Sequence, residues 1–433
     1  MSLLDKKYIH FVGIGGIGTS GLAQILRHQG RIISGSDMSS SEITKSLKHS
    51  GIKVEIGHKS SNVSKKHELL IYSPAIPKSN PELKRAEELK IKMLSYPEAL
   101  GELSKEYFTI AISGAHGKST TTAITALLLK NAGLDPTVII GTKIKEFGNQ
   151  NFRVGKSKYL VVEACEYKRS FLNINPDILV ITNIEADHLD YYKGLNDYKK
   201  AFTEMSKKVK KGGIIIINGN DKNSVDAIKN TKSKVIKLSG IKKMGIKIEP
   251  KVVGAFNKLN ASMAAIVGDL LKIPKEKIEK SISAFKGSWR RLEEKKRIGK
   301  TKIIDDYAHH PTEITMTLEA IREENPHAKI LCVFQPHQYN RTIELLKGFG
   351  NSFHNVDEVI IPNIYKVRDK AEDITKICVK TLVDEINKNS KRSKAKDGHG
   401  LENTAKFISK NHSRYGIIIT MGAGDIYDIH KLF

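Results

Sequence analysis

The sequence predicts an α/β fold of three consecutive domains, each with a mostly parallel, doubly wound sheet of the Rossmann type. A glycine-rich turn between an expected strand and an expected helix occurs twice, and most expected strands are near-continuous apolar runs. A chain of 433 residues is also too long for one ordinary core. We expect domains over residues 1–107, 108–293 and 294–433, the central one being of the phosphate-loop type.

The first glycine-rich turn follows an expected strand at residues 8–12 and precedes an expected helix at 20–28. Its glycines are Gly13, Gly15, Gly16 and Gly18. The next expected strand, at 31–37, ends at Asp37, close to where a ribose-binding acid belongs in a dinucleotide-binding fold. We therefore predict a phosphorylated ligand here. A tight turn without a ligand and a dehydrogenase are the alternatives.

The second glycine-rich turn follows an expected strand at 108–113 and precedes an expected helix at 121–130. It consists of Gly114, Ala115, His116, Gly117, Lys118, Ser119, Thr120 and Thr121. Backbone N–H groups and the dipole at a helix start attract phosphate, Lys118 adds a positive charge, and Ser119 offers a hydroxyl ligand for Mg²⁺. The common form of this motif has a glycine where this chain has Ile112. We predict a site for a nucleoside triphosphate.

Later elements alternate between apolar strands and amphipathic helices. We expect strands at 69–73, 159–163, 178–182, 214–217, 302–305, 329–334, 358–361 and 415–421, and helices at 261–271 and 312–324. Residues 232–251 predict no clear element, and the polar, basic residues 388–397 predict an exposed loop.

Acidic residues follow two of these strands, where ligands bind in open parallel sheets. Glu163 ends one strand, and residues 183–190 follow another. Carboxylates that face phosphates need a cation, so Ser119, Glu163 and one group from 185–190 predict a Mg²⁺ site. The alternative is that Glu163, Glu166 and Asp190 form ion pairs with lysines. This alternative has more weight for Glu166 and Asp190 than for Glu163.

The third domain places polar segments after two strands, at residues 305–312 and 335–342. The adjacent His309 and His310 suggest zinc at first sight. Neighbouring residues on an extended segment face opposite ways, and cysteine is absent nearby, so we do not expect a zinc site. Arg341 suits a substrate carboxylate.

Composition restricts the class of protein and its partners. The net charge is +25, but the lysines are spread along the chain and aromatic residues make up only 6%, so we expect no nucleic-acid partner. Apolar runs are too short to cross a membrane, the start lacks a signal-peptide pattern, and we expect a cytoplasmic protein with no membrane partner. Cys165, Cys332 and Cys378 share no metal or disulfide spacing, and buried thiols are expected.

Taken together, these motifs resemble the Mur ligases over essentially the whole chain, and within them the alanine-adding branch. The resemblance is carried by residues 13–18, 114–121, 183–190, 257–260, 290–291, 306–313 and 334–337. The short phosphate loop is the family's own form. The resemblance implies that ATP activates the carboxylate of UDP-N-acetylmuramate as an acyl phosphate, which L-alanine attacks to form an amide. It also implies ATP and two Mg²⁺ ions as cofactors.

The resemblance implies roles for residues in each domain, the first binding the UDP-sugar, the second ATP, and the third closing over both with the amino acid. It implies UDP-sugar contacts from Gly13, Gly15, Gly16, Gly18, Ser36, Asp37 and Ser73. ATP contacts come from Gly114, Ala115, His116, Gly117, Lys118, Ser119, Thr120, Asn260, Arg291 and Asp306. Metal ligands are Ser119, Glu163 and His188. Amino-acid contacts are Tyr307, His309 and Arg341, and the catalytic set is Lys118, His309 and Arg341.

Several positions depart from the family pattern. Serine replaces threonine at Ser119, Phe256 replaces a histidine beside adenine, and Cys165 replaces an aspartate. Gln338 replaces an arginine, so amino-acid recognition depends on Arg341, and L-alanine versus glycine or serine stays open. The segment before residue 257 is also shorter than in typical relatives.

Phe202 stands where several sister ligases have a carbamylated lysine, which favours the alanine-adding branch. A murein-tripeptide recycling ligase and a catalytically inactive nucleotide-sugar-binding relative are the alternatives. The oligomeric state and feedback control stay open.

Overall fold

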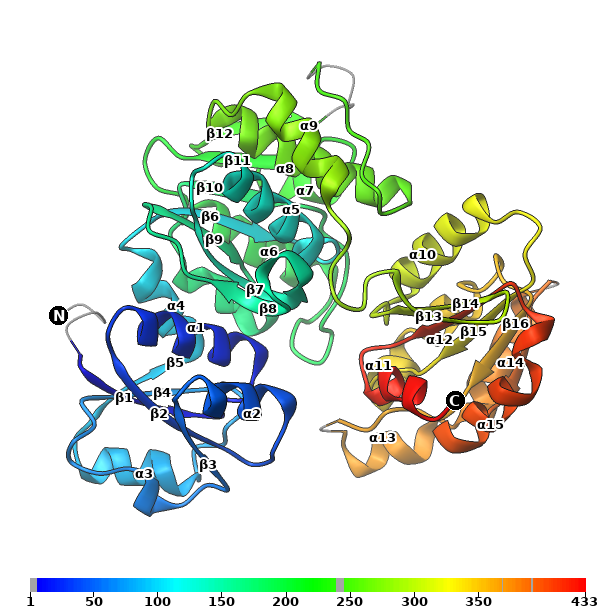
Figure 1. Cartoon of the computed structure of the whole chain (residues 1–433), viewed down its shortest axis with the longest axis horizontal. Helices are drawn as coiled ribbons and strands as arrows, with labels where there is room; N and C mark the ends of the chain where they lie inside the picture. The colour runs from blue at the N-terminus through cyan, green and yellow to red at the C-terminus, as the bar shows by residue number, and fades with distance from the viewer. Residues whose placement is uncertain (1–5, 239–244, 368, 391) are drawn as a thin grey trace. The chain divides into compact units, whose positions relative to one another are not determined.

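The computed structural model describes residues 6–238, 245–367, 369–390 and 392–433 (Figure 1). The chain packs into two compact units, Met1–Glu249 with Leu259–Phe285, and Pro250–Lys258 with Lys286–Phe433. In the described residues, the first unit contains two sheets and the second contains one. The predicted α/β class with mostly parallel sheets is confirmed. The domain boundaries at 107/108 and 293/294 stay predictions.

The first sheet has the strand order β3-β2-β1-β4-β5, with parallel neighbours throughout. Its region comprises β1 (Tyr8–Val12), α1 (Ile17–His28), β2 (Ile32–Asp37), α2 (Glu42–His49), β3 (Lys53–Ile56), β4 (Leu69–Tyr72), α3 (Pro81–Glu88), β5 (Lys92–Ser95) and α4 (Tyr96–Ser104). The strand order changes direction between β1 and β4, and ligands bind at such switch points. The first glycine-rich turn follows β1 and therefore lies at this point.

Both faces of the first sheet are covered, because its side chains alternate between two apolar cores. Ile9 and Phe11 of β1 pack in the same core as Leu22 of α1. Val12, the next residue along, packs with Leu83 of α3 in the other core. The near-continuous apolar strand is therefore the result of a sheet that is buried on two sides.

The second sheet has the order β12-β11-β10-β6-β9-β7-β8, in which only the pair β7 and β8 is antiparallel among the described strands. Its region comprises β6 (Phe108–Ser113), α5 (Lys118–Asn131), β7 (Thr137–Ile144), β8 (Gln150–Arg153), β9 (Tyr159–Glu163), the 3-10 segment η4 (Tyr167–Asn173), β10 (Ile178–Ile181), α6 (Leu195–Ser206), β11 (Ile214–Asn218), α7 (Lys222–Ala227), β12 (Lys234–Leu238), α8 (Ala255–Leu270) and α9 (Lys275–Ala284). Part of the unassigned stretch 232–251 is thus strand β12, and residues 239–244 lie outside the described residues.

The third sheet has the order β13-β14-β18-β15-β16-β17, and β13 is antiparallel to β14. Its region comprises β13 (Glu293–Ile298), β14 (Thr301–Asp306), α10 (Pro311–Glu324), β15 (Ile330–Phe334), α11 (Tyr339–Glu344), α12 (Leu346–Gly350), β16 (Glu358–Ile361), α13 (Ala371–Lys376), α14 (Val379–Asn389), β17 (Lys394–Asp397), α15 (Leu401–Asn411) and β18 (Ile417–Met421). Ile304 packs with Ile314 of α10 on one face, and Ile303 packs with Ile408 of α15 on the other. This sheet is also covered on both sides.

The prediction of an exposed loop at residues 388–397 is wrong. Helix α14 continues to Asn389, and β17 pairs in parallel with β16 at the edge of the third sheet. Ala395 is buried while Lys394 is exposed, so the short strand alternates. Lysine is tolerated in an edge strand because one side of the strand faces water. The polar composition of this segment therefore predicted a loop where the structure has a strand.

The expectation of buried thiols is correct for Cys332 and wrong for Cys165 and Cys378. Cys332 lies inside β15 and is fully buried. Cys165 follows β9 by two residues, where the chain has left the sheet, and is exposed, as is Cys378. In the described part of the chain, no helix is long and apolar enough to cross a membrane.

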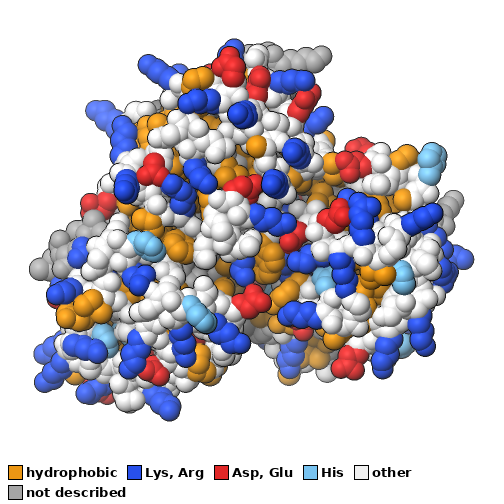
Figure 2. Space-filling view, in the orientation of Figure 1, with side chains coloured by type: hydrophobic (Ala, Val, Ile, Leu, Met, Phe, Trp, Pro, Cys, Tyr) orange, Lys and Arg blue, Asp and Glu red, His pale blue; other side chains and the backbone are white. Residues whose placement is uncertain are grey.

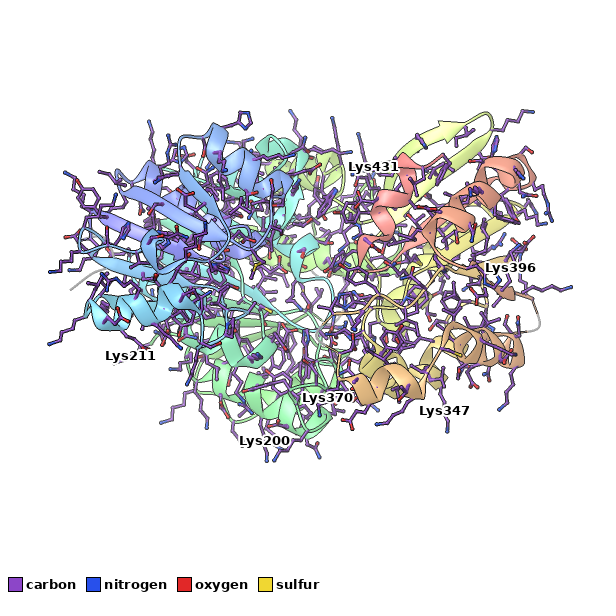
Figure 3. All side chains as sticks on the ribbon, turned by 90° about the horizontal axis from the view of Figure 1, so that it is seen from below. Lys200, Lys211, Lys347, Lys370, Lys396 and Lys431 are labelled. Atoms are coloured by element: carbon purple, nitrogen blue, oxygen red, sulfur yellow. The ribbon has the colours of Figure 1, made fainter. Side chains whose placement is uncertain are left out.

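Positive charge is dispersed over the surface. Figure 2 shows Lys and Arg side chains scattered over the whole visible face, interspersed with acidic ones. Figure 3 shows labelled lysines that extend outward from separate elements: Lys200, Lys211, Lys347, Lys370, Lys396 and Lys431. The net charge of +25 therefore produces a broadly positive surface on this face, which attracts anionic ligands without specifying one.

A buried arginine organises the end of the third sheet. Arg290 is only 1% exposed, and its Nε donates to Oδ2 of Asp305 at 2.8 Å. Its Nη2 donates to the carbonyl of Gly422 at 2.5 Å, and the ring of Tyr427 lies 4.9 Å from the guanidinium carbon. Burial opposes ionisation of Asp305, yet its pKa lies below the usual value because hydrogen bonds and nearby positive charge, Arg290 included, stabilise the carboxylate.

We predict that Arg290→Met lowers the free energy of unfolding by about 3–5 kcal/mol, because it leaves Asp305 as an uncompensated buried charge. Urea unfolding of the full chain measures this change. Arg414→Met is the control, since its side chain is 51% exposed and its removal changes stability by at most about 0.5 kcal/mol. Equal effects of the two substitutions would contradict the prediction.

Candidate functional site

The second glycine-rich turn forms a loop from the end of β6 to the start of α5. Gly114 and Gly117 have φ of 135° and 84°, the left-handed region that favours glycine. The loop is held by residues that follow β10. The N–H groups of Ala115 and His116 donate to the carbonyl and side-chain oxygens of Asn183, at 3.0 and 2.9 Å. Helix α5 begins without a side-chain cap, so its first N–H groups are available to an anion.

Lys118 folds back over this loop. Its Nζ donates to the carbonyls of Gly114 and Ala115, at 2.6 and 2.9 Å, and to Oε1 of Glu166 at 3.0 Å. Burial opposes protonation, but the carboxylate of Glu166 outweighs it, and the pKa of Lys118 is raised. The lysine is therefore a cation held at the place where phosphate groups would bind.

Glu166 pairs with a lysine, as the alternative for this residue predicted, but that lysine is the largely buried Lys118 of the phosphate loop and not one on the surface. It is completely buried, pairs with Lys118, and has Oε1 3.5 Å from Nε2 of His188. Burial opposes ionisation, but Lys118 and His188 together lower the pKa of Glu166. The hydroxyl of Tyr192 donates to the backbone carbonyl of Glu166. Glu166 follows β9 on irregular backbone, so no strand or helix periodicity marks its side chain as buried.

Two of the three predicted metal ligands are in contact. The hydroxyl of Ser119 donates to Oε1 of Glu163 at 3.0 Å, and Oε2 of Glu163 accepts from the N–H of Gly141 at 2.8 Å. The third, His188, belongs to a neighbouring group, in which one potential ligand atom from each of Glu166, Asp187 and His188 lies within 4.8 Å of the others. Hydroxyl and carboxylate oxygens are donors that suit Mg²⁺.

Asn260 of α8 lies directly against the phosphate loop. A β-carbon at Gly117 would overlap the side-chain amide of Asn260, which is 4% exposed. The structure thus places this predicted ATP-binding residue beside Gly117. Which part of a nucleotide it contacts stays a prediction.

The first glycine-rich turn is organised by the end of β2. The N–H groups of Gly13 and Ile14 donate to the carbonyl of Ser36, at 2.9 and 3.0 Å. The N–H of Gly15 donates to Oδ2 of Asp37 at 2.8 Å, and a β-carbon at Gly13 would lie 3.0 Å from Cβ of Ser73. The structure therefore brings the residues predicted to hold the UDP-sugar together at the switch point of the first sheet.

The side chain of Ser36 faces the protein interior. Its hydroxyl is fully buried and donates to Oε2 of Glu82 at 2.6 Å. Glu82 is itself completely buried and also accepts from Nδ2 of Asn62 at 2.6 Å. Ser36 therefore shapes the glycine-rich turn with its backbone carbonyl, a role that no sequence pattern distinguishes from a ligand contact.

In the second compact unit, predicted residues gather around the segment that follows β14. His309 has Nδ1 3.4 Å from Oε2 of Glu313, and Nη1 of Arg291 lies 3.7 Å from Oε1 of the same carboxylate. The ring of Tyr307 lies 5.3 Å from that of His309 and 5.2 Å from the Arg291 guanidinium carbon. Glu313, to which the sequence motifs gave no individual role, is the residue that joins this group.

Asp306 and His310 have defined local partners. Asp306 accepts from the N–H groups of Leu292 and Ala308, at 2.7 and 2.8 Å, and burial raises its pKa to about 6. His310 accepts from the N–H of Thr312 at 3.3 Å and caps α10. The two adjacent histidines therefore have different local partners, Glu313 for His309 and the N–H of Thr312 for His310.

Gln338 and Arg341 lie at the start of the segment that follows β15. Gln338 has φ of 72°, and its Nε2 donates to the carbonyl of Val367 at 3.3 Å. Arg341 follows within α11 and is half-buried. The side chain of Gln338 is thus held by neighbouring backbone, and a role for Arg341 toward an amino acid stays a prediction.

The described residues combine a loop of the phosphate-binding form after β6 with a glycine-rich turn of the Rossmann type after β1. Three family models match the chain: "Mur ligase family, catalytic domain" over residues 8–108, "Mur ligase middle domain" over 112–243 and "Mur ligase, glutamate ligase domain" over 290–424. The UDP-N-acetylmuramate–L-alanine ligase of Clostridium botulinum is 42% identical, over 99% of this chain and 98% of its own length. The corresponding ligase of Clostridium novyi is 39% identical, over 99% and 97%. The chain belongs to the Mur ligase family.

Solved structures agree with this assignment. The UDP-N-acetylmuramate–alanine ligase of Thermotoga maritima matches with a TM-score of 0.80 and 26% identity, over 99% of this chain and 98% of that one. A murein peptide ligase from Psychrobacter arcticus matches with a TM-score of 0.73 and 21% identity, over 98% and 97%. The second match shows the shared fold alone.

We predict that Gly117→Ala weakens binding of a nucleoside triphosphate about tenfold or more, because the added methyl group displaces the loop or Asn260 and costs about one charge-assisted hydrogen bond. Titration with a fluorescent nucleotide analogue measures the dissociation constant.

Gly133→Ala is the matched control for this substitution. Gly133 also has a positive φ, 89°, but a β-carbon added there would have nothing among the described residues within 4 Å. The control thus carries the backbone strain without the clash. An unchanged dissociation constant in Gly117→Ala would refute the role of this glycine.

Proposed function

We propose that the chain uses ATP to join L-alanine to the lactyl carboxylate of UDP-N-acetylmuramate, forming an amide, ADP and phosphate. The observation that carries the proposal is 42% identity, across 99% of this chain, to a ligase of that name. The assembled phosphate loop, with Lys118 held beside Glu166, supports it. Of the three domains predicted from the sequence, the first would bind the UDP-sugar, the second ATP and the third the amino acid.

The reaction has two steps. A carboxylate oxygen of the sugar attacks the γ-phosphorus, the bond to the β–γ bridging oxygen breaks, and ADP leaves with that electron pair. The amine of L-alanine then attacks the acyl carbon, the carbon–oxygen bond to phosphate breaks, and the amine loses a proton. Lys118 and the N–H groups at the start of α5 would stabilise negative charge on the transferred phosphoryl group.

Ser119 and Glu163 would hold one Mg²⁺, and His188 would contribute to a second. Bound Mg²⁺ neutralises charge on the phosphates of ATP. In the second compact unit, Tyr307, His309 and Arg341 would receive the amino acid, and Arg291 and Asp306 would contact ATP. The predicted cytoplasmic location and the absence of a nucleic-acid partner stay predictions.

The decisive assay measures phosphate release with UDP-N-acetylmuramate, ATP and a panel of amine substrates. We expect release with L-alanine, and glycine and L-serine test whether Gln338 has relaxed the amino-acid preference. A murein tripeptide is included because a recycling ligase shares the fold. Release with the tripeptide alone would show that the proposed substrate is wrong.

We predict that Lys118→Ala reduces kcat by about 10²–10³-fold, because the transferred phosphoryl group loses its principal cation from the protein. Lys130→Ala is the control, since Lys130 lies in the last turn of the same helix and donates to the carbonyl of Glu146 at 3.1 Å. Steady-state phosphate release measures both variants. Equal kcat values for the two variants would remove the loop from the proposed mechanism.

A further inference from the structure

Tyr96 lies where the first glycine-rich turn meets the second domain. It is the first residue of α4, and its ring packs against Gly18, the last glycine of that turn. A β-carbon at Gly18 would lie 2.6 Å from Cζ and 2.7 Å from the hydroxyl oxygen of Tyr96. Glycine at position 18 is therefore what allows the phenol to reach this place.

The same phenol is close to the end of β9. Burial raises the pKa of Tyr96, and the nearby Cys165 and Glu163 raise it further. The same two residues act on Lys118 of the phosphate loop. Helix α4 also packs along η4, since a β-carbon at Gly101 would overlap the backbone of Asn173. Tyr96 thus touches the first glycine-rich turn and lies near Glu163, which accepts a hydrogen bond from Ser119 of the second turn at 3.0 Å.

The hydroxyl of Tyr96 is available to a ligand. Across residues 6–238 and the other described ranges, it has no hydrogen-bond partner, and the neighbouring Cys165 is exposed. The phenol stays protonated at neutral pH, so it acts as a hydrogen-bond donor. Its surroundings include the carboxylate of Glu163, which repels an incoming anion.

We propose that the hydroxyl of Tyr96 donates a hydrogen bond to the carboxylate of the nucleotide-sugar acid that the reaction activates. This inference rests on the proposed function, which requires that carboxylate to extend from the first glycine-rich turn to the γ-phosphate beside Lys118. Tyr96 touches the first turn and shares neighbours with Lys118, so it lies on that route. A neutral donor there orients the carboxylate and offsets repulsion from Glu163.

A pair of ligands tests the proposal. UDP-N-acetylmuramate carries the lactyl carboxylate, and UDP-N-acetylglucosamine is the same nucleotide sugar without it. Isothermal titration gives dissociation constants of both for the wild type, Tyr96→Phe and Tyr8→Phe. Tyr8 is the control because it is a half-buried tyrosine at the opposite, amino end of β1.

We expect Tyr96→Phe to raise the dissociation constant of UDP-N-acetylmuramate about tenfold or more, because a hydrogen bond to a charged group is lost. The dissociation constant of UDP-N-acetylglucosamine should change less than about twofold. The KM for the sugar acid should rise by a similar factor while the KM for ATP stays within about twofold. Tyr8→Phe should match the wild type for both ligands. Equal weakening of the two ligands indicates a purely structural role and overturns the proposal, as does no weakening of either.

Failure of this inference is separable from failure of the proposed function. A wild-type protein that ligates L-alanine, together with a Tyr96→Phe variant that binds both sugars normally, refutes the role of Tyr96 alone. A wild-type protein that binds UDP-N-acetylmuramate no more tightly than UDP-N-acetylglucosamine also refutes the carboxylate contact. A wild-type protein that binds neither sugar refutes the proposed function and this inference with it.

Discussion

The buried ion pair between Lys118 and Glu166 is the interaction on which the second domain's site depends. It joins the phosphate loop after β6 to the segment after β9, and through His188 it reaches the segment after β10. Removing two charges from water is expensive, so such a pair adds little net stability. Its effect is positional, because three chain segments must place their groups together for either charge to be compensated.

The two glycine-rich turns use the same strand–turn–helix geometry with different supports. In the first, protein oxygens from the end of β2 accept the N–H groups of Gly13, Ile14 and Gly15. In the second, the side-chain oxygen of Asn183 accepts from the N–H of His116, and the first N–H groups of α5 have no side-chain cap. Helix α1 after the first turn likewise begins without a side-chain cap, so the first N–H groups of both helices are available to an anion.

Much of the fold was predictable because parallel strands buried on two faces leave long apolar runs in the sequence. The strands β6, β9, β10 and β11 all appear in this way, and both glycine-rich turns follow from spacing. The edge strand β17 was missed because its lysines face water. Glu166, Glu313 and Tyr96 were missed because each lies on a turn or a helix start, where no periodicity marks a side chain as facing a site.

The sequence by itself determined the α/β class, the positions of the two glycine-rich turns and the family to which the chain belongs. These properties depend on local spacing and on which residue types stand in order along the chain. The tertiary structure alone decided that Glu166 is buried against Lys118, that the hydroxyl of Ser36 faces Glu82, and that Tyr96 packs against Gly18 of the first turn. Burial and partner choice arise when segments distant in sequence pack together, and a charged or hydroxyl side chain has the same local sequence whether it faces water, a core or a ligand.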